Sequence, residues 1–124
     1  MNFKKSPIKI TSKVAIEEDS YIVDEIEVKL LNKSKSGVYE IRNLQTGKYY
    51  IGQSRDLEKR MKAHFYKLDK GIHPISELQW DYDIHGRSGF EFRVIIFCLP
   101  SQLTFHENIL IKTLNPYYNV HKIH

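Results

Sequence analysis

A carboxylate stands out on the last helical segment that the sequence predicts. Leu103, Leu110 and Leu114 recur at helical spacing, and Glu107 falls inside the same apolar stripe. An ionised carboxylate on a buried face is costly unless it is paired or bound to a metal ion. Two interpretations stay open: Glu107 lies at the rim of the stripe, half solvated or bridged to Arg or Lys, or it holds a metal ion. Spacing alone favours the first.

Arg60 and His64 form a basic pair, four residues apart on an earlier predicted helix. They lie at the edge of the apolar stripe of that helix, where an arginine can grip a phosphate through two parallel hydrogen bonds. A histidine there can shuttle a proton or contact a phosphate. The alternative is a solvated basic helix face, with His64 half buried against the core, and the sequence weighs the two interpretations about evenly.

Tyr39 and Tyr50 lie in two short runs of β-branched and aromatic residues. Tyrosine is common in strands, so each residue alone has an ordinary structural explanation. A tyrosine acts as a general acid or base only if its pKa is lowered or a proton relay adjoins it. His73 precedes Pro74 in a loop that enters a helix, and for it a surface position is the default expectation.

An antiparallel hairpin is predicted to position the two tyrosines. Residues 38–42 and 48–51 alternate in the manner of strands, and residues 43–47 carry turn residues. Gly47 suits a positive φ in that turn. The hairpin therefore brings Tyr39 and Tyr50 onto neighbouring strands.

A helix is predicted directly after the hairpin. It begins at a cap, Ser54 or Asp56, runs to about Leu68 and ends at Gly71. Its apolar stripe consists of Leu57, Met61, Phe65 and Leu68. Three basic residues lie elsewhere on its surface: Lys59, Lys62 and Lys67.

Two further helices are predicted. The second opens at Pro74 and closes at Gly86. Its apolar side consists of Ile75, Leu78 and Tyr82. The third is capped by Ser101, carries the stripe that includes Glu107, and stops at Asn115-Pro116.

The remaining segments complete the fold. Residues 90–99 are largely apolar and predict a strand in the centre of the sheet, and residues 117–120 predict an edge strand or an extended tail. The element order is hairpin, two helices, strand, helix and tail, which indicates the α/β (α+β) class. We expect a small sandwich with a short, largely antiparallel sheet flanked by helices.

The N-terminal residues differ from the rest. Residues 1–35 are predicted to form an extension that packs on a domain of residues 36–124. Residues 8–11 alternate like a short strand, whereas residues 21–30 fit a strand or a helix, with a slight preference for a strand. Residues 32–36 have the composition of a linker.

Composition limits the classes of function. The 124 residues suffice for one core, and the net charge of +4 suits a polyanionic partner. Cys98 is the single cysteine, so neither a disulfide nor a cysteine-based metal site can form within one chain. There is no P-loop, dinucleotide fingerprint or nucleophile elbow, which leaves a simple ion as the expected cofactor. Without a membrane span or a signal peptide, we expect a soluble, intracellular (cytoplasmic) protein.

These residues together resemble the GIY-YIG nuclease family. The two signatures stand here as Gly37-Val38-Tyr39 and Tyr50-Ile51-Gly52, with valine in place of the usual isoleucine. The helix with Arg60 and His64, the triplet His106-Glu107-Asn108, and Asn119 after Tyr118 follow in the family's order. The resemblance covers residues 36–120. It is strongest to the catalytic domains of phage group I intron homing endonucleases, including the run from Lys70 to His73.

The resemblance implies a metal-dependent endonuclease that hydrolyses phosphodiester bonds of double-stranded DNA. It implies one Mg²⁺ ion, with Mn²⁺ as a substitute, held by Glu107. The implied catalytic residues are Tyr39, Tyr50, Arg60 and His64. The expected contacts with DNA phosphates are Arg55, Lys59, Lys62, His73 and Asn119.

Several alternatives remain open from the sequence. The role of such an enzyme is homing, restriction or phage-encoded cleavage of other genomes. A second hypothesis is a catalytically degenerate nucleic-acid-binding module on the same fold, and a third is a basic protein-interaction domain. The intact tyrosines, arginine and glutamate favour the enzyme. One site addresses one strand at a time, so a homodimer is a further expectation, and residues 1–35 are expected to support DNA contact or self-association.

Overall fold

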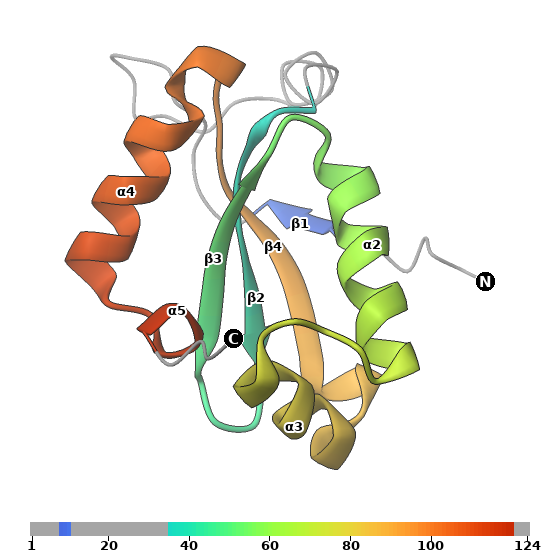
Figure 1. Ribbon diagram of the computed structural model, residues 1–124. Helices are drawn as coiled ribbons and strands as arrows, with labels where there is room; N and C mark the ends of the chain where they lie inside the picture. The colour runs from blue at the N-terminus through green and yellow to red at the C-terminus, as the bar shows by residue number, and fades with distance from the viewer. Residues whose placement is uncertain (1–7, 11–34, 121–124) are drawn as a thin grey trace.

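A twisted four-stranded sheet forms the centre of the protein (Figure 1). The computed structural model describes residues 8–10 and 35–120. The strand order is β1-β4-β2-β3, where β1 is Ile8–Ile10, β2 is Gly37–Asn43, β3 is Tyr49–Ser54 and β4 is Phe90–Phe97. The β2–β3 and β2–β4 pairs are antiparallel, and β1 joins β4 in parallel. The sheet is thus largely antiparallel with β4 inside it, as the sequence predicts.

The hairpin that carries the two tyrosines forms as expected. Gly47 has φ of 81°, and its N–H donates to the carbonyl of Asn43 at 2.8 Å. The Asn43 side chain accepts from the N–H of Gln45 at 2.9 Å, so both the backbone and the side chain of Asn43 stabilise the turn. Tyr39 is paired with Gly52 and Ile41 with Tyr50 across the two strands. Residue types at the turn therefore fix the register that brings the tyrosines together.

Helix α2, Leu57–Lys70, covers one face of the sheet together with α3, Ser76–His85 (Figure 1). Asp56 is its cap, because its side chain accepts from the N–H of Lys59 at 3.1 Å. Gly71, with φ of 77°, ends it. All four residues of the predicted stripe are buried: Leu57, Met61, Phe65 and Leu68.

The starts of the later helices differ from the predictions. The α3 helix begins at Ser76, two residues after Pro74, and no side chain caps it. The α4 helix, Leu103–Leu114, follows a 3-10 turn, Pro100–Gln102, so Ser101 belongs to that turn and does not cap the helix. A second 3-10 turn, Arg87–Gly89, precedes β4. Prolines at the helix entries are thus followed by one irregular turn before regular hydrogen bonding starts.

The prediction of an extended end was wrong. Residues Tyr117–Val120 form a short helix, α5, in which the N–H groups of Asn119 and Val120 both donate to the carbonyl of Pro116 at 3.1 Å. The edge of β3 does not receive a strand here because a side chain takes its place. Asn119 accepts from the N–H of Ile51 at 2.8 Å and donates to its carbonyl at 2.9 Å.

Two apolar clusters hold the layers together. The larger lies between the sheet and α2 with α3, and includes Tyr39, Phe92 and Tyr118. The smaller lies under α4, where Leu103 is buried. Leu114 is 46% exposed, so the stripe predicted for this helix is only partly covered. The reason is that α4 packs along the edge strand β3 and reaches the sheet face with only part of its surface (Figure 1).

Some expectations fall outside the described residues. These include residues 11–34, for which a strand was predicted at 21–30, and the last four residues. The strand predicted near Ile8 forms as β1, so the proposed extension contributes a strand to the sheet. Of the helices in the part of the chain that the structure describes, none is long and apolar enough to cross a membrane.

Candidate active site

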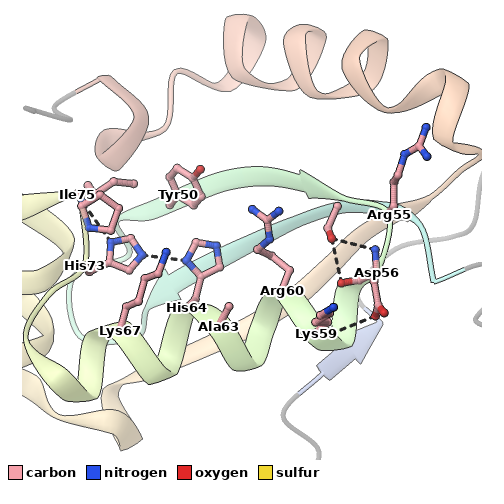
Figure 2. Close-up of a pocket in the computed structure, with 12 residues that line it drawn as sticks. Tyr50, Arg55, Asp56, Lys59, Arg60, Ala63, His64, Lys67, His73 and Ile75 are labelled. Atoms are coloured by element: carbon pink, nitrogen blue, oxygen red, sulfur yellow. Dashed lines mark hydrogen bonds between the residues drawn. The ribbon is translucent and has the colours of Figure 1, made fainter.

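A pocket of about 750 Å³ opens at the free edge of β3, between this strand, α2 and the loop that joins α2 to α3 (Figure 2). Tyr50 comes from β3, and Arg60 and His64 come from α2. His73 and Ile75 come from the loop before α3. Three separate segments of the chain thus supply the lining, and they bring together six of the predicted site residues: Tyr50, Arg55, Lys59, Arg60, His64 and His73.

The charge of the lining is mostly positive. Its basic residues are Arg55, Lys59, Arg60 and Lys67. Asp56 is the one acid in the lining, and its carboxylate is engaged as the helix cap. Figure 2 shows Arg60 rising from α2 across the strands, with Lys67 further along the same helix. Such a surface suits a phosphate ester better than any neutral ligand.

Lys67 does not lie where the sequence placed it, whereas Lys62 does. We expected both on the outer surface of α2, yet Lys67 lines the pocket. Arg60, His64 and Lys67 follow the spacing i, i+4 and i+7, which places them on one face, and this spacing could have identified Lys67. Lys62 is outside the lining, and its ammonium lies 3.6 Å from the carboxylate of Glu58.

Tyr39, His64 and His73 form a connected chain beneath the pocket. The phenol oxygen of Tyr39 lies 2.6 Å from Nε2 of His64. Nδ1 of His64 lies 2.9 Å from Nε2 of His73 (Figure 2). All three side chains are buried, so His73 is not the surface residue that its loop position suggested. The sequence distance of nine residues between the two histidines gave no hint of this contact.

The ionisation of these groups is strongly perturbed. Burial, followed by the neighbouring His73 and the charge of Arg60, lowers the pKa of His64 to about 3. Burial and then the charge of Lys67 lower the pKa of His73 to about 4. Burial raises the pKa of Tyr39 well above its usual value, and Tyr50 adds to this rise. The histidines and Tyr39 are therefore neutral at neutral pH.

Gly52 makes room for the Tyr39 side chain. A Cβ atom on Gly52 would meet the Tyr39 hydroxyl and would lie 2.6 Å from its ring carbon Cζ. A Cβ on Gly37 would meet the carbonyl oxygen of Ile96 on the neighbouring strand. Both glycines of the two signatures are thus required by close approach, Gly52 to the site and Gly37 to the sheet.

Glu107 approaches the same strand edge from the opposite side, on α4. It is half-buried, and its Oε1 accepts a hydrogen bond from the side chain of Gln53 at 2.6 Å. The interpretation of a partly solvated acid at the rim of the stripe fits this position, although the partner is an amide and not Arg or Lys. Gln53, on β3, was not singled out from the sequence. Gln53 lies three residues after Tyr50 on β3, so the alternation of side chains along a strand places it on the opposite face, toward α4.

The tyrosines connect Glu107 with Arg60. Burial raises the pKa of Tyr50, Glu107 adds to the rise and Arg60 opposes it. The same two charges act on Tyr39. Both charged groups therefore influence the ionisation of both hydroxyls.

Glu107 is the candidate ligand for a metal ion at this strand edge. In residues 8–10 and 35–120, no three side chains of the His, Cys, Asp or Glu type gather into a metal-binding group. Mg²⁺ fits a site with a single carboxylate, because it keeps several water ligands and completes its shell with substrate phosphates. Gln53 fixes one oxygen of Glu107 and leaves the other carboxylate oxygen as a ligand.

Asn119 does not reach the pocket. Both polar atoms of its amide pair with the backbone of Ile51, next to Tyr50. This contact fixes the edge of β3 at the position that presents Tyr50 to the pocket. The structure thus places Asn119 behind the site, where it supports the strand.

Comparisons with known proteins agree with this geometry. A family model described as the GIY-YIG catalytic domain matches residues 35–119. Intron-associated endonuclease 1 of Enterobacteria phage T4 is 38% identical over 91 residues, which is 72% of this chain and 37% of that protein. The chain thus matches little more than a third of the length of this curated relative.

Solved structures are similar as well. The catalytic domain of homing endonuclease I-TevI superposes with a TM-score of 0.60 at 36% identity, covering 64% of this chain and 88% of that one. A single-substitution variant of the I-TevI catalytic domain gives the same TM-score and identity and is covered to 84%.

Proposed function

Because this chain belongs to the GIY-YIG family, we propose that it is a metal-dependent endonuclease that hydrolyses phosphodiester bonds in double-stranded DNA. One observation carries the proposal. Arg60 from α2 and Glu107 from α4 act electrostatically on the same two hydroxyls, those of Tyr39 and Tyr50, at the edge of β3. A cation for the phosphate, a carboxylate for a metal ion and two phenols thus lie near the same part of β3.

Binding of the phosphodiester is assigned to the basic pocket. Arg60 is exposed and can donate two parallel hydrogen bonds to the non-bridging oxygens of the scissile phosphate. In the transition state these oxygens gain negative charge, so the same guanidinium stabilises the transition state. Arg55 and Lys59 at the start of α2, and Lys67 further along it, would bind phosphates on either side of Arg60.

Glu107 is the residue proposed to hold a divalent metal ion. GIY-YIG nucleases generally use such an ion, and Mg²⁺ is the proposed one, with Mn²⁺ as a substitute. When bound, the ion polarises the phosphate and stabilises the leaving oxygen. Gln53 would orient the Glu107 carboxylate through its 2.6 Å hydrogen bond.

Tyr39 and Tyr50 supply neutral hydroxyls beside that phosphate. Their raised pKa values keep the protons on both oxygens at neutral pH. Tyr50 lines the pocket and can donate to a phosphate oxygen or to the attacking water. Tyr39 lies deeper, and His64 holds its oxygen. A single set of these residues addresses one strand at a time, so a double-strand cut requires reorientation or a homodimer.

The first test is cleavage of supercoiled plasmid by the full chain, with Mg²⁺ and with a chelator, followed by sequencing of the ends. We expect nicked or linear product only with the metal. Glu107→Gln should lose cleavage and keep DNA binding, because it removes the metal ligand at nearly constant volume. Glu58→Gln, on the outer face of α2, is the matched control and should keep both.

The opposite results distinguish the alternatives. Full Mg²⁺-dependent cleavage by Glu107→Gln would refute the metal assignment. DNA binding by the wild-type chain without cleavage in Mg²⁺ or Mn²⁺ would favour the nucleic-acid-binding module. Since its substrate is DNA, we expect the enzyme to act inside the cell. Its role in homing, restriction or attack on other genomes follows from the sequenced ends.

A further inference from the structure

The hydrogen-bonded chain from Ile75 to Tyr39 has a fixed direction at one end. The backbone N–H of Ile75 lies 3.1 Å from Nδ1 of His73, and a backbone N–H can only donate. Nδ1 of His73 is therefore a bare acceptor. A neutral imidazole carries one N–H and one bare nitrogen, so the proton of His73 is on Nε2.

The tautomer of His73 determines the tautomer of His64. Nε2–H of His73 donates to Nδ1 of His64 over 2.9 Å. His64 then carries its own proton on Nε2, which lies 2.6 Å from the phenol oxygen of Tyr39. His64 is thus the donor and Tyr39 the acceptor. The reverse direction would require His73 to accept hydrogen bonds at both nitrogens, which only an imidazolate anion can do.

The neutral forms of both histidines are the stable ones. His64 is 8% exposed and His73 is 7% exposed. Burial, the largest cause in each case, lowers the pKa of His64 to about 3 and that of His73 to about 4. The start of α3 also fixes the backbone of His73, whose N–H donates to the side chain of Gln79 at 2.9 Å.

We propose that His64 and His73 are a positioning pair that directs the Tyr39 hydroxyl, and that they do not relay protons. The consequence for catalysis rests on the proposed function. Because the phenol oxygen accepts from His64, the Tyr39 proton points away from His64. The charge of Arg60 acts on the same hydroxyl and lowers its pKa against the effect of burial. Any proton that leaves Tyr39 therefore passes to a group on the substrate side, since the His64 nitrogen that faces Tyr39, Nε2, already carries a proton.

The direct test is the tautomeric state of His64 in the full-length wild-type chain. In a nitrogen-15 NMR spectrum, Nε2 of His64 should have the shift of a protonated ring nitrogen and Nδ1 that of a bare one. His73 should show the same pattern. The signals of His64 are identified by their absence from His64→Gln protein. A proton on Nδ1 of His64, or a doubly protonated ring at neutral pH, would overturn the proposal.

A pair of variants tests the consequence for catalysis. Glutamine at position 64 offers one acceptor for His73 and one donor for Tyr39, but it cannot carry a proton. Leucine offers neither. We expect the single-turnover cleavage rate of His64→Leu to fall roughly 10- to 100-fold below that of His64→Gln, the effect of one lost hydrogen bond to a buried group. Equal losses in both variants would show that His64 must carry a proton, and the proposal would be wrong.

The two measurements separate this proposal from the proposed function. If the wild-type chain does not cleave DNA in any divalent metal, the proposed function fails. The NMR measurement still decides the direction of the hydrogen-bonded chain in that case. If cleavage is found and His64 is protonated on Nδ1, the function stands and the positioning pair is refuted.

Discussion

The phenol oxygen of Tyr39, on β2, lies 2.6 Å from Nε2 of His64, on α2. This contact joins the first signature of the chain to the helix that carries Arg60. It places a buried hydroxyl beside His64 and within the electrostatic influence of Arg60. The position of this one oxygen depends on the space left by Gly52 and on the tautomer of His64.

Gly52→Ala should therefore damage the site more than the fold. The added methyl group would meet the Tyr39 hydroxyl. We expect a loss of about 1–3 kcal/mol in the free energy of unfolding from overpacking. The cleavage rate should fall about 100-fold, because the displaced hydroxyl loses its alignment. Urea unfolding and single-turnover cleavage measure the two effects.

Gly47→Ala is the matched control for this variant. Gly47 has φ of 81°, and no atom lies within 4 Å of a Cβ placed there. Its cost should be about 1 kcal/mol of backbone strain, with the cleavage rate unchanged in the folded protein. If the two alanine variants reduce cleavage equally, crowding of Tyr39 is not the cause.

Lys67→Ala should weaken DNA binding and its dependence on salt. Lys67 lines the pocket, whereas Lys62 pairs with Glu58 outside it. Loss of one phosphate contact should reduce the slope of log affinity against log salt by about 0.9 for duplex DNA. Binding by fluorescence anisotropy at several salt concentrations gives this slope. Lys62→Ala should leave the slope unchanged. A smaller slope for Lys62→Ala than for Lys67→Ala would instead support the Lys62 phosphate contact predicted from the sequence.

The stability of the protein should fall as the pH is lowered from about 7 toward 4. The unfolded chain takes up protons at His64 and His73 near pH 6.5, while the folded chain does so only near pH 3 and 4. Lower pH thus favours the unfolded state, by up to about 1.4 kcal/mol per pH unit for each histidine. His73→Gln should remove one of these contributions. Equal pH dependence of wild type and variant in urea unfolding would contradict the shift.

Asn119→Ala should destabilise the protein without changing its phosphate contacts. The variant leaves the N–H and the carbonyl of Ile51 without the side chain that pairs with both. The expected loss in the free energy of unfolding is about 1–3 kcal/mol. The salt dependence of DNA binding should stay as in the wild type. Asn108→Ala, at an exposed position of α4, is the control; a reduced salt slope for Asn119→Ala alone would support the phosphate contact predicted from the sequence.

Periodic features of the sequence predicted most of the fold. The alternation around Tyr39 and Tyr50 gave the hairpin, and the stripe from Leu57 to Leu68 gave α2 with its correct buried face. Such patterns repeat over several residues, so one face of each element can be identified. The four residues of α5 are too short for a period, and there the extended structure predicted from the sequence was wrong.

Contacts between distant residues were not predictable in the same way. The pairs Gln53–Glu107 and Ile51–Asn119 are separated by 54 and 68 residues. No local pattern records such a pair, and only the packing of α4 and α5 on the edge of β3 creates it. Glu107 was noticed because it interrupts an apolar stripe, although that stripe is only partly buried in the structure. The sequence thus predicted which residues form the site better than it predicted their hydrogen-bond partners.

Arg60 is proposed to act on the reacting phosphate, together with Glu107 and the two tyrosines. The most direct measurement is the single-turnover rate of DNA cleavage in Mg²⁺ at saturating protein, for wild type, Arg60→Ala and Lys59→Ala. Both variants remove one cation from the lining of the same pocket. We expect a loss of about 10²- to 10³-fold for Arg60→Ala, typical of a lost transition-state contact, whereas Lys59→Ala should reach the wild-type rate at saturation. Equal rates for the two variants, or no cleavage by the wild type, would contradict this role of Arg60.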